Sequence, residues 1–178
     1  ITIGTNTFSG NGDDERFTGV VANDLEKLVT NVNANRRFCS INAAIASSFT
    51  ANTHVITTSA ANYPEAVVIN KSVDIRGATY GIPVNTRTHA AATESYVVGP
   101  AAGSAFTLGA GAGGTSIRGF SVGSVLNNGY RGVDMTHTLT GVTISENLFN
   151  GFTPGLAVSL AAGASNNTVS ENDITNAY

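Results

Sequence analysis

Short apolar segments recur along this chain from about residue 54 onward, separated by turns rich in Gly and Asn. Ile75, Ile117, Ile144 and Val169 occupy equivalent places in four such segments, at successive intervals of 42, 27 and 25 residues. Five residues after each of them lies another bulky apolar residue, namely Tyr80, Val122, Phe149 and Ile174. Recurrence of this kind predicts a repeat architecture.

Two further columns test this frame. Phe106, Val133 and Val158 begin the apolar-x-apolar triplets "FTL", "VDM" and "VSL", again at intervals of 27 and 25 residues. The triplets "HVI" (54–56) and "YVV" (96–98) share the interval of 42. The pattern predicts a coiled chain of about four turns, in which each short strand lies parallel to its counterpart one turn later, about 4.8 Å away. Like residues then stack inside the coil.

The longest interval is explained by an insertion, for which "GIPVNTRTHAAATES" (81–95) is the obvious candidate. Residues 51–178 are therefore expected to form the coil, and residues 1–50 an N-terminal strand and helical cap that fold with it as one unit. The strand is "ITIGTNTF" (1–8), where Ile and Thr alternate.

Two short helices are predicted within this cap. The first covers 23–32, because Asn23 and Glu26 have the spacing of a capping box and Leu25, Leu28, Val29 and Val32 share one helical face. The second is "SINAAIASSF" (40–49), with Ser40 as N-cap residue. Its apolar face is Ile41, Ala44 and Ile45.

The stretch from Ser40 to Gly81 resembles the entry segment of the pectin-lyase-like superfamily. Tyr63-Pro64-Glu65 and Arg76-Gly77-Ala78 stand where those proteins carry a Tyr-x-Glu turn and an Arg-Gly-Ala strand end. "GTSIRGFSV" and "GVTISENLF" resemble the coils that follow. The resemblance covers about residues 38–178 and implies an all-β fold, a right-handed parallel β-helix. It implies little about function, because the superfamily includes lyases, hydrolases, adhesins and phage spikes.

Glu146 and Glu171 are the first candidates for chemistry, since the repeat puts them at corresponding sites of adjacent turns. Such a pair could bind Ca²⁺ or act as a glycosidase pair. The same place holds Gly77 and Gly119 in earlier turns, so we interpret both Glu residues as solvent-facing turn residues. Asn147 and Asn172 are expected to brace the corner by stacked hydrogen bonds.

The catalytic patterns of the superfamily's enzymes are missing. There is no Asp cluster of the pectate lyase kind, and the only Asp-Asp pair, Asp13-Asp14, precedes the coil. Its surroundings, "GNGDDE", resemble a calcium-binding repeat, so Ca²⁺ is the one cofactor considered. Arg76 and Arg118 share an outward column. We interpret that column as a solvated face, with contact to an acidic sugar as the alternative.

Composition narrows the choice of partners. Only 12% of residues are charged and the net charge is −3, so no basic surface is available for nucleic acid. No apolar run reaches 18 residues, which argues against a membrane span.

Cys39 is alone and is expected to be a small buried residue. Asn70 and Asn166 begin glycosylation acceptor patterns. With two Lys against seven Arg, the composition favours a secreted or cell-surface protein.

The ends of the coil lead to the functional hypothesis. The helices cover the N-terminal end, whereas the last turn is followed by no lid, and an open strand edge invites pairing with another chain. We expect an extracellular structural or adhesive protein that assembles head to tail as a filament or surface layer. The residues assigned to assembly are Ile1, Ile3, Phe8, Ile174 and Tyr178.

Two alternatives stay open. The chain could be a lyase, a hydrolase or a non-catalytic binding domain for acidic polysaccharide, using Glu146, Glu171, Arg76 and Arg118. The absence of an initial Met also indicates a processed chain or a fragment, in which case the coil continues in a longer protein.

Overall fold

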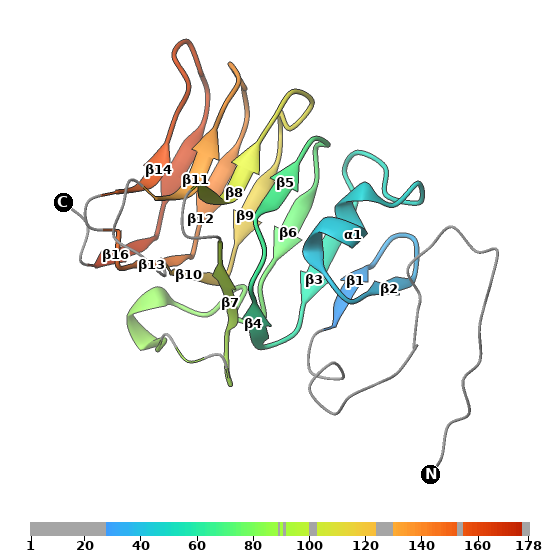
Figure 1. Ribbon diagram of the computed structural model, residues 1–178, viewed down its shortest axis with the longest axis horizontal. Helices are drawn as coiled ribbons and strands as arrows, with labels where there is room; N and C mark the ends of the chain where they lie inside the picture. The colour runs from blue at the N-terminus through green and yellow to red at the C-terminus, as the bar shows by residue number, and fades with distance from the viewer. Residues whose placement is uncertain are drawn as a thin grey trace.

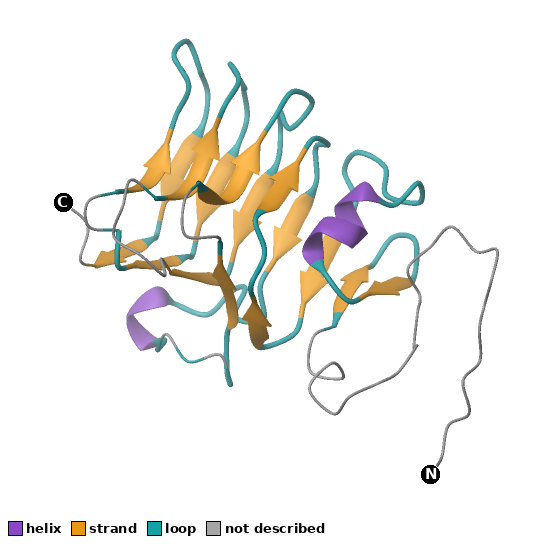
Figure 2. Ribbon diagram, in the orientation of Figure 1, coloured by secondary structure: helices purple, strands orange, loops and turns teal. Residues whose placement is uncertain are grey.

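The computed structural model describes residues 28–88, 90, 92–99, 103–123, 130–152 and 155–175. Figures 1 and 2 show that most of the regular structure in the described residues consists of short strands, which form three sheets. All pairs between successive turns are parallel. The all-β class with parallel pairing, as predicted, is confirmed.

The first sheet has seven strands in the order β15-β12-β9-β6-β3-β1-β2. Their bounds are β1 Val29–Asn31, β2 Arg36–Phe38, β3 Val55–Thr58, β6 Asp74–Arg76, β9 Ser116–Arg118, β12 Thr143–Ser145 and β15 Thr168–Ser170. The second sheet has the order β16-β13-β10-β7-β4. Its strands are β4 Ala61–Tyr63, β7 Ser95–Val98, β10 Phe120–Gly123, β13 Leu148–Asn150 and β16 Asp173–Thr175.

The third sheet has the order β14-β11-β8-β5. Its strands are β5 Val67–Ile69, β8 Ser104–Leu108, β11 Arg131–Met135 and β14 Leu156–Ser159. From β3 onward the chain visits the first, second and third sheets in that order, four times completely and then through β15 and β16. The number of turns agrees with the repeat in the sequence.

The register of the strands confirms the two best-defined columns. Ile117 pairs with Ile75 on one side and with Ile144 on the other, and Ile144 pairs in turn with Val169. In the third sheet, Phe106 pairs with Val133 and Val133 with Val158. Because side chains alternate between the faces of a strand, this register keeps every apolar residue of a column on the inner face.

Two assignments across the insertion were wrong. The segment 54–56 leads into β3 of the first sheet, whereas Tyr96–Val98 belongs to β7 of the second sheet. Val97, not Tyr80, precedes Val122 in its column. The insertion falls between β6 and β7, so the interval of 42 residues holds between Ile75 and Ile117 of the first sheet but not between the strands of the second sheet.

The predicted helix over 23–32 was wrong where the structure describes it. Val29–Asn31 is strand β1, which pairs antiparallel with both β2 and β3. Val29 and Asn31 are buried and Thr30 between them is half-buried, so the local period is that of a strand. Pairing with two neighbouring strands outweighs the weak helical preference of so short a segment.

The second predicted helix is confirmed as α1, Ile41–Ala46. The Ser40 hydroxyl accepts a hydrogen bond from the Ala43 amide at 3.0 Å, which is the expected N-cap. The buried face consists of Ile41, Ala44 and Ile45, as the apolar spacing indicated. Cys39, just before this helix, is exposed, so the prediction of a buried thiol was wrong.

Charged side chains hold α1 at both ends. The two carboxylate oxygens of Glu65 accept from the amides of Ile41 and Asn42, at 2.9 and 3.0 Å. The Lys71 ammonium donates to the carbonyls of Ile45 and Ser47, at 2.8 and 2.9 Å. A negative group at the N-terminus and a positive one at the C-terminus suit the helix dipole. This explains the Glu of the Tyr-x-Glu turn.

Asn42 ties the same helix to the edge of the third sheet. Its side-chain oxygen accepts from the Val68 amide and its side-chain nitrogen donates to the Ala66 carbonyl, both at 2.8 Å. One side chain thereby satisfies the backbone groups that a further strand would otherwise bind beside β5. The helix and this contact close the third sheet at its N-terminal end.

Aromatic side chains fill the core between the sheets. Phe106 and Phe120 meet edge to face with ring centroids 5.3 Å apart, and Tyr130 stacks on Phe152 at 5.7 Å. Tyr130 is 1% exposed. Burial, which disfavours the phenolate, raises the pKa of Tyr130 to about 12 from an ordinary value of 10.0.

Tyr130 makes stability depend on alkaline pH. Between pH 10 and about 12 the unfolded chain releases this phenolic proton while the folded chain keeps it, so stability is full below pH 10 and falls as the pH rises toward 12. Urea unfolding at pH 8 and pH 11 should show this loss, and Tyr130→Phe should reduce it. An equal loss in both proteins would contradict the assignment.

Candidate functional site

The corner between the first and second sheets is built on left-handed backbone. Gly119, Glu146 and Glu171 occupy the same place in three successive turns, with φ of 76°, 58° and 55°. The Gly119 amide donates to the Glu146 carbonyl and the Glu146 amide to the Glu171 carbonyl, both at 3.1 Å. Glycine adopts this conformation freely, whereas glutamate adopts it at a cost of roughly 1–2 kcal/mol.

Asparagine side chains brace this corner, as predicted. Asn147 is fully buried. Its side-chain oxygen accepts from the Phe120 amide at 3.0 Å, and its side-chain nitrogen donates to the Ile117 carbonyl at 2.9 Å. That nitrogen also donates to the side-chain oxygen of Asn172 at 3.1 Å. The Asn side chains thus bind backbone groups whose usual backbone partners are lost where the chain bends.

The insertion between β6 and β7 folds back over the corner and contains the short 3₁₀ helix η1, Val84–Thr86. Arg87 and Glu94 anchor it through an ion pair of 2.8 Å, with side chains only 2% and 1% exposed. Arg87 also donates to the carbonyls of Glu146 and Phe120. The sequence reasoning missed this pair, for which the only signal was an Arg and a Glu in an otherwise uncharged insertion.

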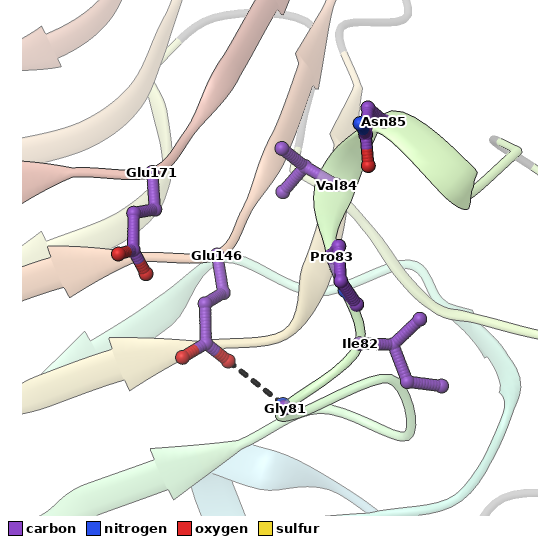
Figure 3. A pocket seen from close by; sticks show the side chains of 7 residues that line it. All are labelled: Gly81, Ile82, Pro83, Val84, Asn85, Glu146 and Glu171. Atoms are coloured by element: carbon purple, nitrogen blue, oxygen red, sulfur yellow. Dashed lines mark hydrogen bonds between the residues drawn. The ribbon is translucent and has the colours of Figure 1, made fainter.

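A groove of about 370 Å³ lies between the insertion and the corner. We define the groove by its lining residues, which are Gly81, Ile82, Pro83, Val84, Asn85, Glu146 and Glu171. Figure 3 shows the two carboxylates on neighbouring turns, with that of Glu146 directed to Gly81 of the insertion. A carboxylate oxygen of Glu146 accepts from the Gly81 amide at 2.8 Å. The sequence brought the two Glu residues together, but it did not place the insertion opposite them.

Arg76 and Arg118 lie on the same sheet but do not line the groove. Both donate to Asp74, at 2.8 Å for Arg76 and 3.1 Å for Arg118. Both guanidinium groups also lie 4.7 Å from the centre of the Tyr80 ring. The hydrogen bond to Asp74 raises the pKa of Arg76. Both Arg side chains are partly exposed, as expected of a solvated face, but each is also held by Asp74 and Tyr80. Among the described residues that line the groove, none is basic.

No metal centre is apparent in the described residues, which contain no group of three His, Cys, Asp or Glu side chains able to hold an ion. The calcium candidates Asp13 and Asp14 lie outside the described residues. No helix within the described ranges is long and apolar enough to cross a membrane.

The second candidate surface is the end face, which we define as the outer side of β14, β15 and β16, the last strand of each sheet among the described residues. Val169 is 44% exposed, whereas Ile144, its partner in the preceding turn, is fully buried. Ile174 is 47% exposed, whereas its partner Phe149 is fully buried. Leu160, beside β14, is also exposed. Three apolar columns therefore continue to a surface that no other described residue covers.

Of the residues assigned to assembly, Ile174 lies on the end face. Ile1, Ile3, Phe8 and Tyr178 lie outside the described residues. Neither protein-family models, curated proteins nor solved structures gave a match to this chain.

Replacement of Glu171 tests the corner conformation. Glu171→Gly should raise the free energy of unfolding by up to about 1 kcal/mol, because glycine accepts the positive φ. Glu171→Ala is the matched control: it also removes the carboxylate but keeps the strain, so it should bring no such gain. Urea unfolding of the three proteins measures the difference. Equal stability of the Gly and Ala variants would show that the strain is absent.

Proposed function

We propose that the three sheets form a right-handed parallel β-helix of the pectin-lyase-like kind. The fixed order of sheets and the parallel register between turns support this proposal. A crossover between parallel strands of one sheet is right-handed in nearly all proteins, for steric reasons. Glu65, the last residue of the Tyr-x-Glu turn, binds two amides at the start of α1, which gives a physical reason for the resemblance at this turn.

We propose that this protein is an extracellular structural or adhesive protein that assembles through its end face. The observation that carries the proposal is the abrupt change in exposure between the last two turns, from fully buried Ile144 and Phe149 to half-exposed Val169 and Ile174. Covering a large apolar side chain is worth on the order of 1 kcal/mol or more. A strand that pairs with an open edge adds backbone hydrogen bonds. The low charge content of the chain supports a location outside the cell.

Light scattering after gel filtration, over a range of protein concentrations, tests this proposal. The chain should form assemblies whose mass rises with concentration, visible by negative-stain microscopy. Val169→Lys should abolish them, because a charge cannot be buried at the contact without great cost. Thr107→Lys is the matched control, since Thr107 lies half-buried on β8, between β5 and β11, away from both ends of the molecule. A wild-type chain that stays monomeric at high concentration refutes the proposal.

We propose carbohydrate binding in the groove as a second function. The observation that favours it is the combination of an exposed apolar wall, with Ile82 44% exposed, and two carboxylates that can accept from sugar hydroxyls. Without a basic lining residue, the groove suits a neutral or amino sugar rather than an acidic polysaccharide. Titration with chitosan and cellulose oligomers, against polygalacturonate, tests this. Ile82→Ala should weaken binding, and equal binding by the variant contradicts the site.

A further inference from the structure

The opposite end of the molecule has the features needed to complete the end face. We infer that the partner of the end face is the N-terminal end of a second copy, with β2 of one copy pairing beside β15 of the next. This inference rests on the proposed assembly and names the surface that completes it. Three observations carry it, concerning strand direction, the shape of the two ends and their charge.

The direction of β2 suits a head-to-tail contact. β1 is antiparallel to β3 and β2 is antiparallel to β1, so β2 runs in the same direction as β3. β3 is parallel to β6, and the same direction continues through β9 and β12 to β15. Among the described strands, β2 and β15 are thus the two outermost of one sheet, and they run the same way. Simple translation of a copy along the sheet brings them together as a parallel pair.

The shapes of the two ends also match. The first sheet extends by β1 and β2 beyond β3, whereas the second sheet ends at β4 and the third at β5. The described part of the last turn has β15 and β16 but no strand of the third sheet, so joining β2 to β15 leaves a space two strands wide, about 9.6 Å, beside the second sheet and three strands wide, about 14.4 Å, beside the third. A helix is about 10 Å in diameter. α1 lies at this end, packed against β1, β2, β3 and β5 (Figure 1), and therefore occupies part of the wider space beside the third sheet.

The N-terminal end offers an apolar surface of its own. Phe49, shortly after α1, is 43% exposed, and the Arg36 guanidinium lies 3.7 Å from the centre of its ring. Arg36 is on β2, so this aromatic ring lies close to the edge that the inference assigns to pairing. Apolar side chains are thereby available on both sides of the proposed contact, Phe49 on one and Val169, Ile174 and Leu160 on the other.

Charge argues against the competing arrangement, in which two end faces meet. Glu171 follows β15 and Asp173 begins β16, and the sequence contains no Lys or Arg after Arg131. Two copies joined through identical end faces would bring these carboxylates together with no basic side chain between them. β2 instead carries Arg37, which is exposed. A contact between unlike surfaces that does not close produces a filament.

Two variants, each altered at one end only, test the inference. Val169→Lys blocks the end face, and the double variant Arg37→Glu with Phe49→Glu blocks the N-terminal end. All three substituted residues are exposed in the single chain, so each protein should fold, which circular dichroism and urea unfolding verify. Each variant alone should be monomeric by light scattering. An equimolar mixture should form dimers and nothing larger, because only one intact surface of each kind remains per pair.

The outcomes separate this inference from the proposed function. If the N-terminal variant assembles as the wild type does while Val169→Lys is monomeric, the end face assembles but its partner is another surface, and the inference is overturned. If both variants are monomeric and their mixture stays monomeric, β2 and the end face do not meet, and the inference is again overturned. If the wild-type chain itself never assembles, the proposed function fails as well.

Discussion

Asn147→Ala is expected to lower the free energy of unfolding by about 2–4 kcal/mol, since each buried polar group that loses a hydrogen-bond partner costs up to about 1–3 kcal/mol. The two groups concerned are the Phe120 amide and the Ile117 carbonyl, which the Asn147 side chain binds at 3.0 and 2.9 Å. Asn147 is fully buried, so water does not replace it. The turns on either side of the corner should loosen together.

Asn172→Ala provides the matched control, because it deletes the same side chain one turn later. Asn172 binds the Asn147 amide at 2.9 Å and the Ile144 carbonyl at 2.8 Å, but it is only half-buried. Water can reach these groups, so the loss should be about 1 kcal/mol. Urea unfolding of both variants measures the difference. Equal losses would mean that burial does not set the strength of this corner.

Glu94→Gln is expected to destabilise the chain by about 3–5 kcal/mol, the usual cost of leaving one member of a buried ion pair without its partner. Arg87 and Glu94 are almost completely buried, and the pair makes two contacts, at 2.8 and 3.3 Å. Glutamine keeps the size of the side chain but removes its charge. Arg87 would then hold a buried positive charge with only carbonyl oxygens to neutralise it.

The paired variant Arg87→Met with Glu94→Leu distinguishes charge from packing. Its loss should be smaller than that of Glu94→Gln, because both charges are removed and apolar groups take their place. Urea unfolding gives the global effect, and hydrogen exchange of residues 81–88 reports whether the insertion detaches from the corner. A double variant less stable than Glu94→Gln would show that Arg87 acts mainly through its bonds to the Glu146 and Phe120 carbonyls.

Much of the architecture follows from the sequence because the turns of the coil repeat. The stacking of Ile117 on Ile144 and of Val133 on Val158 follows from two intervals, since equal spacing in the chain becomes equal height in the coil. Ser40 as N-cap was likewise readable, because capping involves only the next three residues. Features that depend on neighbouring residues or on exact repetition can be predicted from a single sequence.

The contacts across the insertion and around the N-terminal end could not be predicted from the sequence. The pairing of Tyr96 with Asn62, instead of a residue 42 positions earlier, depends on where the insertion leaves the coil. Strand β1 replaced a predicted helix because β2 and β3 lie on either side of it, which no local pattern in 23–32 records. The neutralisation of Arg118 by Asp74 joins residues on adjacent turns of one sheet.

The sequence by itself therefore determined that the chain is an all-β repeat, which residues stack in the columns after the insertion, and that Asn147 and Asn172 brace a corner. Only the tertiary structure decided that the insertion faces Glu146, that both Arg residues of the outward column are already bound, and that the last described turn exposes Val169 and Ile174. The physical reason is the same in each case. Repetition specifies which residues lie at the same height, whereas exposure and charge balance depend on what other segments place beside them.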